Sequence, residues 1–258
     1  MKRGGKLGNA GVYKYSRTSL LKFTGQRLQI PFSDIDAVWL RRYENWLRTS
    51  GCGDTTISQL FRTLRSVFNK AVELQLVKRD YYPFDAYKVS KFDTRTKKRA
   101  ITKEDIHKLI ELDLSDRDFY TQLAKDIFLF SYFMAGINFK DIALLTYGDI
   151  DNGRIYYARR KTGKMMNCCL TEQAQEIIDK YHTDQMEEDY IFPILDRNVH
   201  TTEKQILERV KKTLKHINKR LHELSEKIGL HTPLTTYVAR HIISSYSLKT
   251  KNLQRFSA

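Results

Sequence analysis

The side chains best suited to chemistry lie in two short stretches of the 258-residue chain. In T-T-Y-V-A-R-H, Arg240 and His241 follow Tyr237 at a spacing of three, within a predicted helix. In the second stretch, a K-T-G turn places Lys161 between two runs with strand character. Arginine and lysine side chains bind oxyanions, and arginine can do so through two hydrogen bonds at once. Taken alone, Arg240 is better explained as an exposed helix arginine and Lys161 as a solvated turn lysine.

The overall charge of the chain indicates what kind of partner these residues could bind. The chain has 45 Lys and Arg against 30 Asp and Glu, a net charge of +15. Such an excess favours a polyanion partner, usually nucleic acid, with an anionic membrane surface as the rival. No apolar run reaches the roughly 18 residues of a spanning helix, and the N-terminus has no signal-peptide pattern. The three cysteines form no metal-binding pattern, so we interpret them as small apolar residues in a reducing cytosol.

The first 90 residues predict a small all-helical domain. Its glycine-rich start, which includes Gly8 and Gly11, is expected to be flexible. Asp34 is the candidate cap of a first amphipathic helix, and a longer helix over 55–72 has one continuous apolar stripe. The other side of that helix is polar. We expect it to contact a DNA groove or backbone, although solvation alone would also explain it; its residues are Arg62, Arg65, Ser66 and Asn69.

A basic linker follows over residues 91–100. The stretch 88–103 has seven basic residues, one acid and little apolar content. A solvated linker is one explanation. We favour a linker that lies along a phosphate backbone, with Lys97, Lys98 and Arg99 as its contacts.

Residues 101–258 predict a second, mostly helical domain. It opens on a capping box between Thr102 and Asp105, and continues with a very apolar helix over 123–134. Asn138 can cap the next helix, with Asp141 placed to reach back to it. The spacing of apolar residues then changes to one typical of strands, and the K-T-G turn between two such runs predicts a β-hairpin. A long amphipathic helix is predicted over 202–228.

Several phrases of the sequence resemble the tyrosine recombinase, or phage-type integrase, family. They are S-Y-F-M-A-G-I-N-F-K-D-I-A-L-L, Y-Y-A-R-R-K-T-G-K and L-T-T-Y-V-A-R-H in the second domain, and S-Q-L-F-R-T-L-R-S-V-F-N-K-A in the first. Their order and spacing cover nearly the whole chain. The resemblance implies a mainly α fold: a helical, SAM-like core-binding domain and a mostly α catalytic-type domain with a small antiparallel hairpin or sheet.

The resemblance also implies a reaction and a partner. In the family a tyrosine hydroxyl attacks a phosphodiester of duplex DNA, forms a 3′-phosphotyrosine and releases the 5′-oxygen, so neither ATP nor a metal or other cofactor is required. Arg240 matches the family's second arginine, and Tyr237 occupies a histidine slot where a hydroxyl can still bind phosphate. His241 matches a packing and hydrogen-bonding residue, and Lys161 the lysine that protonates the leaving oxygen. The flanking basic residues would meet phosphates; they are Arg159, Arg160 and Lys164.

Two departures from the family pattern bear on catalysis. The family's first arginine falls at Asn138, or in one subgroup at Ala135, and neither is basic. Lys140 is close, but we expect it to be solvated. The family's nucleophile follows the second arginine by some thirty residues, whereas the last tyrosine here, Tyr246, follows Arg240 by six. We therefore expect a copy that is truncated at both ends.

Two functions follow from this pattern. One is a site-specific integrase of a mobile element that cuts and rejoins DNA; the other is a DNA-binding remnant without strand cleavage, which the departures favour. RNA binding ranks low because no aromatic RNA-binding signature is present. We further expect a cytoplasmic protein that joins other protomers on DNA. Without the C-terminal segment it would be a monomer in solution.

Overall fold

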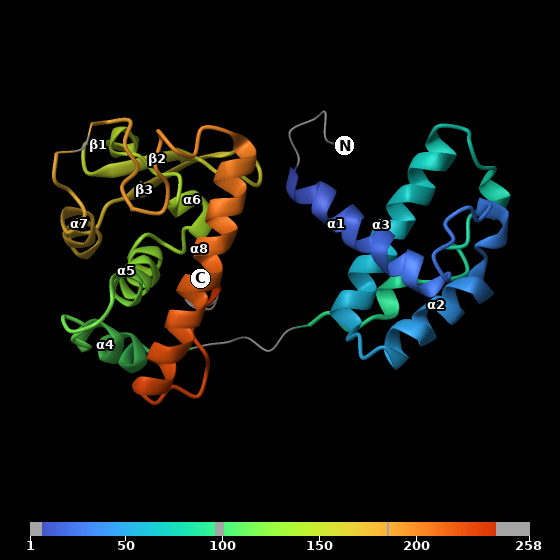
Figure 1. Ribbon diagram of the computed structural model, residues 1–258, viewed down its shortest axis with the longest axis horizontal. Helices are drawn as coiled ribbons and strands as arrows, with labels where there is room; N and C mark the ends of the chain where they lie inside the picture. The colour runs from blue at the N-terminus through green and yellow to red at the C-terminus, as the bar shows by residue number, and fades with distance from the viewer. Residues whose placement is uncertain (1–6, 96–100, 185, 241–258) are drawn as a thin grey trace, which may run out of the picture. The chain divides into compact units, whose positions relative to one another are not determined.

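The computed structural model describes residues 7–95, 101–184 and 186–240 (Figure 1). The chain forms two compact units, Met1–Lys97 and Lys98–Ala258, which we call unit 1 and unit 2. Both units are mainly helical, and unit 2 also contains a three-stranded antiparallel sheet. The predicted fold class is therefore confirmed. Within the described residues, no helix is long and apolar enough to cross a membrane.

Unit 1 is built around two amphipathic helices. Phe61 and Phe68 of the longer helix are fully buried, as are Leu40 and Tyr43 of the shorter one, so the predicted apolar stripe does face the core. Aromatic rings dominate this core: Tyr43 stacks on Phe61 at 5.5 Å between ring centroids. The helices are α1 (Leu7–Phe23), α2 (Ala37–Thr49) and α3 (Asp54–Glu73), with 3-10 turns at Phe32–Asp34, Arg79–Tyr81 and Val89–Lys91.

Two local predictions in unit 1 were wrong. The glycine-rich start forms helix α1 from Leu7 onward, because tertiary contacts hold it: Ser19 hydrogen-bonds the Tyr43 hydroxyl at 2.7 Å across to α2. The cap of α2 is Asp36 and not Asp34, which belongs to the preceding 3-10 turn. The Asp36 carboxylate accepts a hydrogen bond from the backbone N–H of Trp39 at 2.7 Å. The first error arises from a tertiary contact, and the second from the choice between two acids that precede the same helix.

Unit 1 extends into the segment that the sequence assigned to the linker. Phe92 is 5% exposed and belongs to the core of unit 1. The backbone N–H of Asp93 donates to the Asp54 carboxylate at the start of α3, at 3.0 Å. Lys97, Lys98 and Arg99 lie outside the described residues.

Unit 2 has a core of helices packed around α5. Its fully buried residues include Leu123, Ile127 and Phe128, and α5 packs against both α7 and α8. The predicted capping box at Thr102 and Asp105 is present, with N–H to oxygen distances of 3.0 and 3.1 Å. The helices are α4 (Lys103–Glu111), α5 (Phe119–Phe133), α6 (Phe139–Ile142), α7 (Glu172–Asp179) and α8 (Glu203–Lys227), with a 3-10 turn at Tyr147–Asp149.

The sheet of unit 2 contains the predicted hairpin. Its strands are β1 (Ile150–Asp151), β2 (Arg154–Ala158) and β3 (Met165–Cys169), in the order β1-β2-β3. Ala158 pairs with Met165 at the turn end of the β2–β3 ladder. Beyond this pair, the N–H of Arg159 donates to the carbonyl of Lys164 at 2.9 Å and closes the turn. The hairpin thus carries three consecutive basic residues, 159–161, at its tip.

Candidate functional site

Three segments of unit 2 that are far apart in the sequence line one pocket of about 450 Å³. They are α6, the tip of the β2–β3 hairpin and the helical residues 236–240. We call this site the cationic pocket, and its lining residues are Asn138, Lys140, Asp141, Arg159, Arg160, Lys161, Tyr237 and Arg240. Five of these eight side chains are basic and one is acidic. The structure therefore brings together residues that the sequence placed about 100 positions apart.

Residues 236–240 are held in place by their buried side. Leu234, Val238 and Ala239 are fully buried against the core of unit 2. The Asn218 side chain of α8 accepts a hydrogen bond from the backbone N–H of Thr236 at 3.0 Å. This packing leaves Tyr237 56% exposed at the pocket, so it is not a core aromatic residue.

The turn after α5 bears directly on Arg240. Gly136 has a φ of +80°, in the left-handed region that favours glycine. A Cβ atom at this position would lie 3.0 Å from the Cα and 3.3 Å from the Cγ of Arg240. Glycine is therefore required twice, for its backbone conformation and for the close approach of the arginine.

Asp141 links α6 to the hairpin. It is 6% exposed, and its carboxylate accepts a hydrogen bond from the backbone N–H of Arg160 at 3.0 Å. The prediction that Asp141 reaches back to cap its own helix was wrong. Asn138 caps α6 alone, through its side-chain oxygen and the N–H of Lys140 at 3.0 Å. The buried carboxylate is used to fix the hairpin tip over the pocket.

Lys140 is exposed, as predicted for a solvated residue, but it also lines the cationic pocket. At the two positions of the family's first arginine, Ala135 is apolar and Asn138 uses its side-chain oxygen as a helix cap. Lys164 is exposed at the turn of the hairpin and is not part of the pocket lining. His241 lies outside the described residues.

A tyrosine that the sequence did not single out lies next to the pocket residues. Burial, with smaller contributions from Cys168 and Asp141, raises the pKa of Tyr157 to about 12, although Arg159 and Arg240 act in the opposite direction. Its phenol therefore stays protonated at neutral pH. The alternation of the β2 strand could have indicated a half-buried Tyr157, but not its proximity to residue 240.

In unit 1, two of the four predicted DNA-binding residues share a second pocket. Arg62 and Ser66 line an open pocket of about 430 Å³ between α1 and α3, which we call the α1–α3 pocket. The Tyr13 hydroxyl lies 3.0 Å from the Ser66 hydroxyl, and Thr94 closes one edge. Arg65 and Asn69 are exposed but do not line it, and the Asn69 side chain accepts a hydrogen bond from the Tyr82 hydroxyl at 2.6 Å.

No cluster of three or more His, Cys, Asp or Glu side chains that could hold a metal ion is found within the described residues. The side chains that line the cationic pocket supply guanidinium and ammonium donors and one phenol, and such donors bind oxyanions. The geometry suits the binding of a phosphate-sized anion.

Comparisons with known proteins show what the sequence and the fold resemble. Residues 1–89 match the family described as phage integrase SAM-like domain. Among solved structures, a lambda integrase (75–356) dimer bound to a COC′ core site has a TM-score of 0.64 at 15% identity, covering 93% of this chain and 80% of that one. The Tn1549 transposon integrase in complex with a circular intermediate DNA has a TM-score of 0.62 at 14% identity, covering 96% and 84%.

A third structure, the XerH site-specific recombinase bound to its difH substrate, has a TM-score of 0.60 at 14% identity, covering 95% of this chain and 71% of that one. No curated protein matches the chain at a comparable level. At such identities the matches establish the fold. Residues 1–89 match the phage integrase SAM-like domain family, and the described chain shares its fold with these integrase and recombinase structures, as the resemblance predicted.

Proposed function

We propose that this chain binds duplex DNA as a tyrosine recombinase-type protein, with a backbone phosphate in the cationic pocket. One observation carries the proposal: five basic side chains from three segments line 450 Å³ of accessible space. The single carboxylate among them, Asp141, is turned to a backbone N–H of the hairpin. The pocket thus has a large excess of positive charge, which a phosphodiester would neutralise.

The residue types suit a phosphodiester more than a general anion. A guanidinium group places two N–H donors on two oxygens of one phosphate, whereas a lysine acts as a point charge. In the described chain, Lys140, Arg159, Arg160 and Lys161 form no ion pair with an acid. Their positive charges would therefore be available to a DNA phosphate, and DNA binding would weaken steeply as the salt concentration rises.

Unit 1 would add phosphate contacts of its own. Arg62 and Ser66 of the α1–α3 pocket, together with the exposed Arg65 and Asn69, form the face proposed to meet DNA. Lys97 ends this unit in the sequence, and it would extend the contact along the backbone together with Lys98 and Arg99. The proposal also includes other protomers on the same DNA, a cytoplasmic location and a monomer in the absence of DNA. The mass in solution from light scattering tests the last point.

A second function, DNA binding without strand cleavage, is favoured by one observation. The transition state of the family's reaction gathers negative charge on the non-bridging oxygens, and each missing donor would remove about 2–4 kcal/mol of its stabilisation. Here the first-arginine positions offer Ala135 and an Asn138 side chain already used as a helix cap. Lys140 lines the pocket and supplies a charge, but not a fork of two donors.

DNA binding is tested by fluorescence anisotropy with a labelled duplex over a range of salt concentrations. We expect Arg240→Ala to weaken binding about 10–100-fold and to reduce the salt slope by about 0.9. Lys204→Ala is the matched control, because Lys204 lies on α8, away from the pocket lining, with its side chain 79% exposed. Equal affinities for the two variants would refute the pocket as a phosphate site.

Strand cleavage is tested separately with a nicked duplex that traps a covalent intermediate. A protein–DNA adduct that survives denaturation would support recombinase activity. Its absence from a protein that binds the same duplex would support binding without cleavage. Asn138→Arg sharpens the test, because restoring the guanidinium should increase any adduct that forms.

A further inference from the structure

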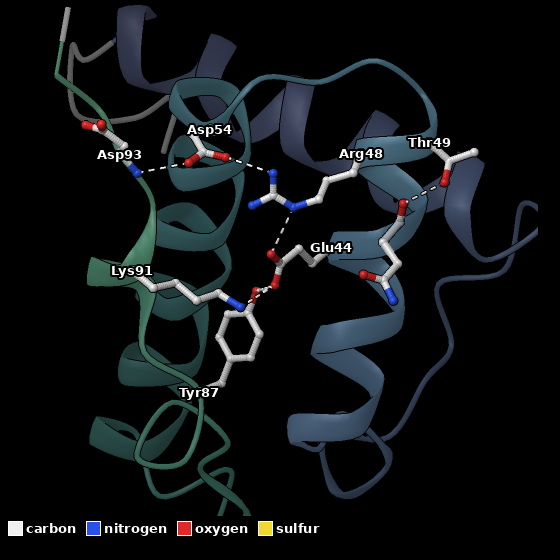
Figure 2. A network of polar contacts seen from close by, with 8 residues as sticks. Glu44, Arg48, Thr49, Asp54, Tyr87, Lys91 and Asp93 are labelled. Atoms are coloured by element: carbon white, nitrogen blue, oxygen red, sulfur yellow. Dashed lines mark hydrogen bonds and ion pairs between the residues drawn. The ribbon is translucent and has the colours of Figure 1, made fainter.

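A carboxylate in the core of unit 1 belongs to a polar network that ties three segments together. Glu44 of α2 is 8% exposed. One of its oxygens accepts a hydrogen bond from Nε of Arg48 at 3.1 Å, and the other accepts from the Tyr87 hydroxyl and from Nζ of Lys91 (Figure 2). A buried carboxylate is unfavourable unless its charge and lone pairs are matched. Here two cations and a phenol match them.

The charge state of Glu44 keeps this network intact at neutral pH. Burial by itself would raise the pKa of the carboxyl group. The hydrogen bonds from Lys91, Tyr87 and Arg48 together outweigh burial, so the pKa lies below the ordinary value for glutamate. Glu44 is therefore ionised at neutral pH, and Lys91 is held by a full negative charge.

The network continues to the backbone of the segment that leaves unit 1. Arg48 also pairs with the Asp54 carboxylate at 2.9 Å, and the second oxygen of Asp54 accepts from the N–H of Asp93 at 3.0 Å. Figure 2 shows this path from Asp93 to Lys91 through residues of two helices. Phe92, between the two anchored residues, is buried in the core. We call residues 91–94 the exit segment. It is thus fixed both by its side chains and by its backbone.

The anchored segment leads directly to the α1–α3 pocket. Thr94, the next residue, lines that pocket together with Arg62 and Ser66. The sequence then continues through Arg95 to Lys97, Lys98 and Arg99. The anchor therefore places the exit segment beside two of the α3 residues that are proposed to bind DNA.

We propose that Glu44 is a positioning residue for DNA binding, which acts through Lys91 and Arg48 to hold the exit segment, with Thr94, at the α1–α3 pocket. The exit segment and α3 would then contact the same stretch of DNA backbone. This inference rests on the proposed function, because it requires DNA at unit 1. Without the anchor, the exit segment would have to be ordered at each binding event, at an entropic cost that weakens binding.

The test compares Lys91→Gln with Lys88→Gln. Lys88 is exposed, lies three residues away and forms no ion pair with an acid in the described chain, so both variants lose one charge and one trypsin site. We expect Lys91→Gln to bind duplex DNA about tenfold more weakly than Lys88→Gln, which corresponds to re-ordering about one residue. In the absence of DNA, trypsin should cleave the linker of Lys91→Gln several-fold faster.

Glu44→Gln gives an independent check, because it raises the net charge by one. Bulk electrostatics predicts tighter DNA binding for this variant, whereas loss of the anchor predicts weaker binding and faster cleavage of the linker. Both tryptophans of the chain, Trp39 and Trp46, lie on α2, so an unchanged emission spectrum confirms that unit 1 remains folded.

The outcomes separate this inference from the proposed function. If the unmodified protein binds no duplex, the proposed function fails and the inference fails with it. If it binds, and Lys91→Gln and Lys88→Gln bind equally, the inference alone is overturned. Faster cleavage with unchanged affinity also overturns it, because the anchor would then have no role in DNA binding.

Discussion

Glu44 in unit 1 and Asp141 in unit 2 are both buried carboxylates, 8% and 6% exposed, but their donors differ. Glu44 takes two cationic side chains and a phenol, whereas Asp141 takes a backbone N–H of the hairpin. In the first arrangement, positive charges are neutralised by an acid within the fold. The second fixes a loop and leaves the charges of that loop at the pocket. In a protein of net charge +15, the partner of each carboxylate thus decides which cations remain available to a ligand.

The largest effect expected from this comparison is the loss of the unit 1 network. Glu44→Ala removes a carboxylate that accepts from two charged donors, which should lower the stability of unit 1 by about 3 kcal/mol. That corresponds to a fall of roughly 10–20 °C in Tm for a domain of this size. Tryptophan fluorescence reports unit 1 alone, since Trp39 and Trp46 both lie there. An unchanged midpoint would show that the network is only a surface feature.

The corresponding change in unit 2 should affect binding more than stability. Asp141→Ala should cost about 2 kcal/mol through one lost charge-assisted hydrogen bond. It also deletes the single acid of the cationic pocket, so electrostatics alone predicts tighter DNA binding. We expect weaker binding, because the hairpin tip with Arg160 loses its anchor. Anisotropy on the same duplex decides between the two, and tighter binding would contradict a positioning role for Asp141.

A smaller effect is expected at Gly136, where Ala introduces a Cβ atom against Arg240. The left-handed backbone alone costs about 1–2 kcal/mol for a residue with a side chain. Gly153→Ala is the matched control, because Gly153 has a φ of +69° but no neighbouring atom within 4 Å of the added carbon. We expect both variants to lose stability on thermal unfolding, but only Gly136→Ala to weaken DNA binding. Equal DNA affinities would show that the contact with Arg240 has no influence on the pocket.

The smallest expected effect is a pH dependence confined to unit 1. The pKa of Glu44 is lowered in the folded state, so its contribution to stability is present above the ordinary pKa of 4.5 and is lost as pH falls through the lower folded-state value. Tryptophan-detected unfolding should therefore show a loss of stability below about pH 4.5 that Glu44→Gln reduces. If the unmodified protein and Glu44→Gln lose stability identically as pH falls, groups other than Glu44 are responsible for the loss.

The elements of this fold could be predicted where hydrophobic period and local caps agree. The stripe of α3, the capping box at Thr102 and the hairpin around Lys161 are of this kind. The start of α1 could not, because its glycines disfavour a helix that contacts such as Ser19–Tyr43 then impose. The cap at Asp36 was missed because Asp34 precedes the same apolar run, and local sequence does not rank two acids that lie two residues apart.

The candidate site divides in a similar way. Lys161, Tyr237 and Arg240 could be recognised by their motifs, and the structure brings them together. The partner of Asp141 could not be foreseen, because its hydrogen bond joins positions 19 residues apart across two elements. Glu44 was also not identified, since a glutamate in an amphipathic helix is normally placed on the solvated face. Long-range polar pairs leave no periodic signal in one sequence.

The close approach of Gly136 to Arg240 also has a genetic consequence. Every nonsynonymous change of a single nucleotide in a glycine codon gives either a stop codon or a residue that carries a Cβ atom. At position 136 each such residue would press on the Cα of the arginine that faces the pocket. No amino-acid substitution that arises from a single nucleotide change at this codon is therefore expected to leave the pocket unchanged. A lineage that needs the pocket must purge every missense allele there, whereas a lineage that no longer needs it should lose this glycine early.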